Sequence, residues 1–145
     1  DMLTCLAGAS PVNVCAQTLP DGGKYRQDNV SMTMTFPDGS IGVVDYLANG
    51  DKSFPKERLE VFCGGSVAVL DDFRELEMTR DGKRTRLKKA QDKGWQAAWV
   101  AFTEAIKAGG PPPIPYEQLI GVTKATFAAV ESLRLAGQVV GIQAA

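Results

Sequence analysis

Histidine is absent from this 145-residue sequence, and its absence excludes a large group of active sites. Zinc sites built from cysteine and histidine, Ser-His-Asp triads and Cys-His dyads all require an imidazole ring. General acid–base catalysis by histidine is excluded for the same reason. We therefore expect no catalytic residue and no metal site within this chain.

Cysteine is scarce, and the three that occur are Cys5, Cys15 and Cys63, with no C-x-x-C pair among them. An odd number of widely spaced cysteines does not predict a disulfide framework. We expect buried free thiols and a reducing, cytoplasmic location. No apolar run reaches the roughly 18 residues that a membrane span needs. The opening residues 1–6 lack the basic and apolar regions of a signal peptide.

The glycine-rich phosphate-binding signatures are also missing, since neither G-x-G-x-x-G nor G-x-x-x-x-G-K-[ST] occurs. We therefore expect no dinucleotide cofactor to be held by this chain. The net charge of −1 gives no attraction to nucleic acid or to an anionic membrane. A basic stretch at residues 83–89 follows the acidic pair Glu75 and Glu77, which favours a charged, exposed edge strand over a phosphate-binding site.

What remains is typical of an ordinary folded domain, with 44% apolar and 23% charged residues. The length suits one domain, so we expect residues 1–145 to form a single unit. The clearest element is residues 30–36, where valine, methionine and phenylalanine alternate with serine and threonine. This period of two predicts a strand with all its apolar groups on one face. The turn at 37–40 then predicts a hairpin with a strand over 41–48.

Further strands are predicted at 12–17, 58–62 and 66–70, followed by a hairpin of 75–79 with 84–88. The spacing then becomes helical, with a stripe that must pack on something: Trp95, Trp99, Phe102 and Ile106. The proline-rich residues 111–115 form a stiff connector to a second helix. This helix is predicted over about 116–135, with a buried side made of Ile120, Phe127, Val130 and Leu133, and residues 139–140 would add an edge strand.

Strands followed by helices indicate an α+β fold, here an open, mostly antiparallel sheet with helices packed on one face. Its serine and threonine face is either solvated or meets another subunit. The loop at residues 49–56 joins amide, carboxylate, ammonium and hydroxyl groups around one aromatic ring. Such groups recognise polyhydroxylated ligands, but composition alone supports a solvated loop equally well.

Several short motifs occur in one order along the chain: residues 12–14, 26–30, 36–40, 60–65, 67–73 and 113–117. In this order they resemble the carboxy-terminal domain of the glucose-fructose oxidoreductase / inositol dehydrogenase / MocA family, over nearly the whole chain. Asp1 and residues 2–8 resemble the end of a family signature in which a histidine precedes an aspartate by three residues. Because the sequence opens at Asp1 inside a helix-like stretch, we expect a fragment boundary there.

The resemblance implies that the catalytic histidine, a lysine in an E-K-P motif and the NAD- or NADP-binding Rossmann domain lie outside this chain. It also implies that the loop at 49–56 faces a sugar or polyol. Asn49, Lys52 and Lys56 would then donate hydrogen bonds to substrate hydroxyls, while Phe54 would pack on a ring face. Trp95 and Ala98 depart from the family, where histidine or tyrosine and an acidic residue are common, which puts a polar contact of that helix in doubt.

The expected function is that of a substrate-binding and oligomerisation domain of an NAD(P)-dependent sugar or polyol dehydrogenase, inactive on its own. The partners would be a Rossmann domain, a sugar or polyol and further copies of the chain through the open sheet face. Two alternatives stay open at this point: a free-standing module that binds a small ligand, and a dimerisation module without catalysis. Charge reversal at Lys52 and Lys56 separates them, because only a ligand-binding module would lose binding.

Overall fold

The computed structural model describes residues 1–20, 23 and 27–142. The chain divides into two compact units, of which unit 1 comprises Asp1–Asn49 with Ala108–Ala145 and unit 2 comprises Gly50–Lys107. The elements of unit 1, in chain order, are α1 (Met2–Ala7), β1 (Asn13–Thr18), β2 (Asn29–Thr35), β3 (Ile41–Leu47), α3 (Tyr116–Arg134) and β8 (Val140–Gly141). Those of unit 2 are β4 (Arg58–Cys63), β5 (Ser66–Asp71), β6 (Glu75–Arg80), β7 (Lys83–Lys88) and α2 (Trp95–Ala108).

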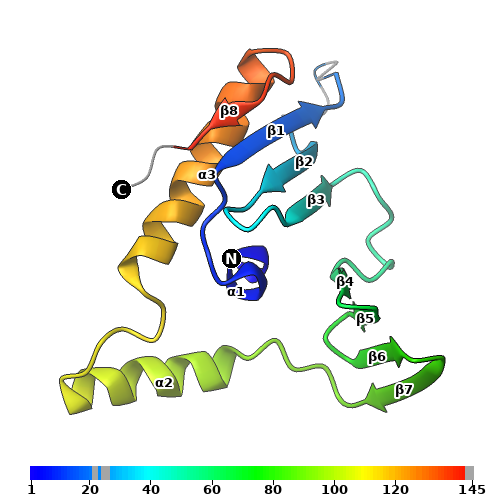
Figure 1. Ribbon diagram of the computed structural model, residues 1–145, viewed down its shortest axis with the longest axis vertical. Coiled ribbons are helices and arrows are strands. Elements are labelled where there is room, and N and C mark those ends of the chain that lie inside the picture. The colour runs from blue at the N-terminus through cyan, green and yellow to red at the C-terminus, as the bar shows by residue number, and fades with distance from the viewer. Residues whose placement is uncertain (21–22, 24–26, 143–145) are drawn as a thin grey trace. The chain divides into compact units, whose positions relative to one another are not determined.

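Unit 1 is an antiparallel sheet in the order β3-β2-β1-β8, and α3 packs on its β1 and β8 side (Figure 1). The predicted alternation in β2 is confirmed: Met32 lies opposite Ala16 and Val44, on the same face as the core. The predicted turn is confirmed as well, with the Phe36 N–H bonded to the Ser40 carbonyl at 2.9 Å. Gly39 takes a φ of 86° in that turn, which favours glycine.

The buried side of α3 differs from the predicted one. Phe127 is 70% exposed, and Ile120 and Val130 are also exposed, while Leu133 is partly buried against the core. The buried residues of α3 are small ones: Gly121, Ala125, Ala128, Ala129 and Ser132. Small side chains let the helix axis approach the strands closely. At Gly121 the space is so tight that a Cβ would lie 2.0 Å from the Ser10 Oγ.

The opposite face of the unit 1 sheet is open, in agreement with the predicted fold class. Ser31 and Thr33 are exposed there. Thr33 lies opposite Val43, and Thr35 lies opposite Ile41. The side chains of Val43 and Ile41 therefore share this face with the two threonines. Val43 is 55% and Ile41 70% exposed, which gives the open face an apolar margin along β3.

Unit 2 contains a second antiparallel sheet in the order β4-β5-β6-β7. The predicted hairpin of β6 and β7 is confirmed, with Asp81 and Gly82 in the turn at φ 50° and 69°. Salt bridges link its strands, with Arg84 on Glu77 at 2.8 Å and Arg86 on Glu75. No residue between 50 and 107 is buried within the described chain, α2 included, and the packing of the Trp95 stripe stays a prediction.

The thiols also differ from the prediction. All three cysteines are free, but Cys5 and Cys63 are exposed rather than buried, and Cys15 is half-buried. Cys15 lies in β1 with its Sγ 3.1 Å from the Gly137 carbonyl, to which it donates. Cys5 lies in the short α1, and Cys63 is the last residue of β4.

Candidate functional site

The loop proposed from the sequence begins at Asn49, directly after β3. The Asn49 N–H donates to the Asn29 Oδ1 at 2.9 Å, and the Ala48 N–H donates to the Asp28 carbonyl at 3.1 Å. Asn29 is itself 2% exposed, so this anchor is buried within unit 1. A buried amide that accepts a backbone N–H fixes the end of β3. The Asn49 side chain starts from a defined backbone position as a result.

The rest of the loop belongs to unit 2 and is organised by Asp51. Its Oδ1 accepts hydrogen bonds from the Ser53 N–H at 2.8 Å and the Ser53 hydroxyl at 2.7 Å. The Phe54 N–H closes the turn on the Asp51 carbonyl at 3.1 Å. Hydrogen bonding to the Ser53 side chain, and then to the Ser53 N–H, lowers the pKa of Asp51 below its ordinary value. The Asp51 carboxylate therefore serves as the acceptor that organises this turn.

The three remaining residues project from this turn into solvent. Phe54 is 74% exposed, and Lys52 and Lys56 are exposed too. Neither ammonium has an ion-pair partner among the residues that the structure describes. Two free cations beside an exposed ring are groups that can bind hydroxyls or anions. The boundary between the units falls after Asn49, so Asn49 belongs to unit 1 and the other three residues belong to unit 2.

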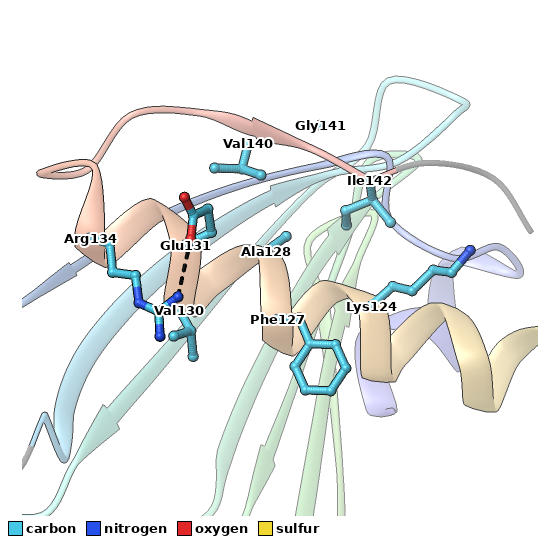
Figure 2. Close-up of a pocket in the computed structure, with 9 residues that line it drawn as sticks. All are labelled: Lys124, Phe127, Ala128, Val130, Glu131, Arg134, Val140, Gly141 and Ile142. Carbon is cyan, nitrogen blue, oxygen red and sulfur yellow. Dashed lines mark hydrogen bonds and ion pairs between the residues drawn. The ribbon is translucent and has the colours of Figure 1, made fainter.

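Several cavities lie within unit 1, and none of them was predicted from the sequence. A shallow groove of about 710 Å³ runs between α3 and β8 (Figure 2). In Figure 2, Phe127 and Lys124 project from α3, and Glu131 is paired with Arg134 at 3.5 Å. Two further pockets of about 330 and 290 Å³ flank α1, and both include Asp1 and Thr4. The position of a cavity depends on how the helices and strands pack together. The spacing of residues in the sequence does not indicate this packing.

A metal site requires a cluster of ligand side chains, and a dinucleotide site requires a glycine turn that leads from a strand into a helix. Within residues 1–20, 23 and 27–142, no three histidine, cysteine, aspartate or glutamate residues cluster as metal ligands would. The longest helix, α3, begins after Pro115 and has no glycine turn between a strand and its first residue. The start of α3 does not fit the pyrophosphate group of a dinucleotide. In the same described ranges, no helix has the length and apolarity to cross a membrane.

No protein-family model matches the chain, and no curated protein matches it. Solved structures do match. An oxidoreductase from Agrobacterium radiobacter, solved with NAD+, L-tartaric acid and magnesium, aligns with a TM-score of 0.80 at 18% identity, over 98% of this chain and 46% of that one. The aldose-aldose oxidoreductase from Caulobacter crescentus, solved with glycerol, aligns at 0.75 and 19% identity, over 96% and 43%.

An inositol dehydrogenase homologue from Azotobacter vinelandii, solved with NAD+, aligns at a TM-score of 0.70 and 16% identity, over 90% of this chain and 43% of that one. At these identities the similarity concerns the fold. This chain spans less than half the length of each of these oxidoreductases. The chain therefore has the fold of one part of oxidoreductases that are about twice its length.

Proposed function

We propose that this chain is the carboxy-terminal substrate-binding and oligomerisation domain of an NAD(P)-dependent sugar or polyol dehydrogenase, inactive by itself. The observation that carries the proposal is the alignment of nearly all of this chain with less than half of several oxidoreductases. A fold does not by itself specify a reaction, so the proposal also rests on the groups that the chain presents.

In this proposal the nucleotide and the catalytic groups belong to the other half of the protein. The reaction would be hydride transfer between a hydroxyl-bearing carbon and NAD or NADP, with the cofactor supplying the redox chemistry. Two matched oxidoreductases were solved with hydroxylated molecules, one with L-tartaric acid and one with glycerol. Lys52, Lys56 and Asn49 would donate hydrogen bonds to such a substrate, and Phe54 would lie against its carbon skeleton.

The proposed oligomer uses the open face of the unit 1 sheet. Val43 and Ile41 supply exposed apolar surface there, and Ser31 and Thr33 supply hydroxyls that form hydrogen bonds across an interface. A subunit contact on this face would leave the α3 side of the sheet unchanged. The cytoplasm, where NAD(P)-dependent metabolism and free thiols coexist, is the proposed location.

The test is a turnover assay on the longer gene product that contains this sequence, beside the purified 145-residue chain. The longer product should reduce NAD or NADP with a polyol, and the chain alone should not. Lys52→Glu and Lys56→Glu in the longer product should each raise the KM about 10-fold or more, because each removes a charged hydrogen-bond donor. Lys89→Glu, an exposed lysine outside the loop, is the matched control. Turnover by the chain alone would refute the proposal.

A further inference from the structure

The sequence contains three asparagines, Asn13, Asn29 and Asn49, and they differ in the residue that follows them. Valine follows Asn13 and Asn29, whereas glycine follows Asn49. The backbone nitrogen of the next residue can attack an asparagine side chain, and a side chain on that next residue obstructs the attack. Glycine has no side chain, and its backbone is the least restricted of all residues. Asn49 is therefore the asparagine whose sequence favours this reaction.

The three carboxamides also differ in how they are held. The Asn13 Nδ2 donates to the Thr35 Oγ1 at 3.1 Å. The Asn29 Nδ2 donates to the Asp28 Oδ1 at 3.0 Å, and the Asn29 Oδ1 accepts the Asn49 N–H. The Asn49 carboxamide itself forms no hydrogen bond with a described residue of unit 1, and the residue is exposed on that unit. Within unit 1 its Cγ is therefore free to turn toward the backbone.

The backbone around Asn49 permits the approach. The hydrogen bond from the Asn49 N–H to the Asn29 Oδ1, at 2.9 Å, fixes the chain before the Asn49 Cα. The attack depends on rotation about the bond after that Cα, which this contact leaves free. Gly50 is the first residue of unit 2, so the reacting peptide bond is the one that joins the two units. The Gly50 N–H donates to none of the described residues of unit 2.

Two aspartates in described turns, Asp38 and Asp81, also precede glycine and could undergo the same cyclisation. An aspartate must be protonated to react, because a carboxylate is a poor electrophile. The Ser40 N–H at 2.9 Å, and then the Ser40 hydroxyl, lower the pKa of Asp38 and so favour its carboxylate form. Asp81 forms an ion pair with Arg80 at 3.5 Å as a carboxylate. The uncharged carboxamide of Asn49 has no such protection.

We infer that Asn49 and Gly50 form a site of spontaneous deamidation. The Gly50 nitrogen attacks the Asn49 Cγ, so that an N–Cγ bond forms and the Cγ–Nδ2 bond breaks. The amide proton of Gly50 leaves with Nδ2 as ammonia. Water then opens the five-membered succinimide at either of its carbonyls, which gives aspartate or isoaspartate at position 49. Either product adds one negative charge to a chain whose net charge is −1.

Both products alter the loop that follows β3. In isoaspartate the Cβ enters the main chain, so the backbone between β3 and the Asp51 turn gains one carbon atom, while the N–H of residue 49 keeps its contact with Asn29. In both products a carboxylate, which only accepts hydrogen bonds, replaces a carboxamide that donates them. The effect on a substrate rests on the proposed function, in which Asn49 donates to a hydroxyl. The modified protein would then bind a polyol less tightly.

The experiment is peptide mapping by mass spectrometry on the native gene product, kept folded at mildly alkaline pH and sampled over time. Trypsin releases residues 27–52 as one peptide, which contains both Asn29 and Asn49 and so carries its own control. Fragment ions should place the mass gain of an amide-to-acid conversion at residue 49 and none at residue 29. A residue 49 that keeps its amide, while a synthetic peptide of residues 45–53 loses it, would show that the fold protects the site and would overturn the inference.

Substitution of Gly50 tests the mechanism. Gly50→Ala keeps Asn49 and adds a Cβ that meets nothing within 4 Å, so the variant should fold normally. Conversion of Asn49 should become about 10-fold slower or more, because the Cβ hinders the attack. Gly141→Ala on β8, whose Cβ would make only an ordinary contact of 3.8 Å, is the matched control and should leave the rate unchanged. An equal rate in Gly50→Ala would refute attack by the Gly50 nitrogen. Neither failure would touch the proposed function, because no cofactor or substrate enters the test.

Discussion

The Ser132 hydroxyl accepts a hydrogen bond from the Ala16 N–H at 2.9 Å, which joins α3 to the middle of β1. The same hydroxyl donates to the Gln138 carbonyl at 2.6 Å. Strand β8 pairs with β1 only at Asn13 and Val14, so the Ala16 N–H has no strand partner on that side. Ser132, which is fully buried, supplies the missing acceptor.

Ser132→Ala should therefore lower the free energy of unfolding by about 1–3 kcal/mol, since it leaves a buried N–H without an acceptor. Urea unfolding followed by circular dichroism measures this change. Thr123→Ala is the control on the same helix, because its exposed hydroxyl bonds to the Leu119 carbonyl within the helix itself. Equal stability of both variants would show that the Ser132 hydroxyl does not hold β1.

Gly121→Ala should destabilise unit 1, although alanine is normally the better residue within a helix. The added Cβ would lie 2.0 Å from the Ser10 Oγ and 2.6 Å from its Cβ, so α3 must shift from its contact. We expect a loss of about 1–3 kcal/mol in a urea titration. The double variant Gly121→Ala with Ser10→Gly removes both clashing atoms and should recover most of the loss. A stabilising Gly121→Ala would contradict the close approach.

The Asp51 turn gives a pH-dependent prediction. Its pKa is lowered, so its contribution to stability is present above the ordinary aspartate pKa and is lost as the pH falls through the lowered value. Ser53→Ala removes the largest cause and should move the Asp51 pKa back toward its ordinary value. A carboxyl-detected NMR titration follows this directly. Asp38, whose pKa is lowered chiefly by the Ser40 N–H, is the internal control and should not move. An unchanged Asp51 in Ser53→Ala would refute the assignment.

The open face of the unit 1 sheet gives a prediction about assembly. Val43→Lys in the longer gene product should reduce its oligomer to a smaller species in sedimentation velocity, because it places charge in the proposed apolar margin. Val43 is exposed, so the variant should fold normally. Ile114→Lys, an exposed residue of the proline-rich connector, should leave the oligomer intact. Dissociation by both variants, or by neither, would count against this face as the interface.

Much of the fold was predictable because its signals are local. The alternation of β2, the Pro37–Ser40 turn and the Asp81–Gly82 hairpin depend on neighbouring residues, and all three are confirmed. The buried side of α3 was not predictable from hydrophobicity. It depends on how closely the helix approaches β1, which selects alanine and glycine over the larger Phe127 and Ile120.

The candidate site was predictable only as far as residue type. The sequence indicates which groups of the loop suit a sugar, namely Asn49, Lys52, Phe54 and Lys56, and these stay predictions. The buried Asn29 that anchors the loop, and the Ser53 bonds that commit Asp51 to a turn, depend on contacts that no spacing reveals. The α2 stripe was expected to pack on another surface. Helical periodicity predicts such packing but does not say which surface the stripe contacts.

The central claim, that this chain works as one half of a longer dehydrogenase, is tested most directly by the mass of the native gene product. An antibody raised against the chain, used on a lysate of the source cells, gives that mass. The account predicts a band at roughly twice the chain's 15.5 kDa, as the matched oxidoreductases suggest. A band at 15.5 kDa would contradict it, and the chain would then be a binding or dimerisation module without a catalytic half.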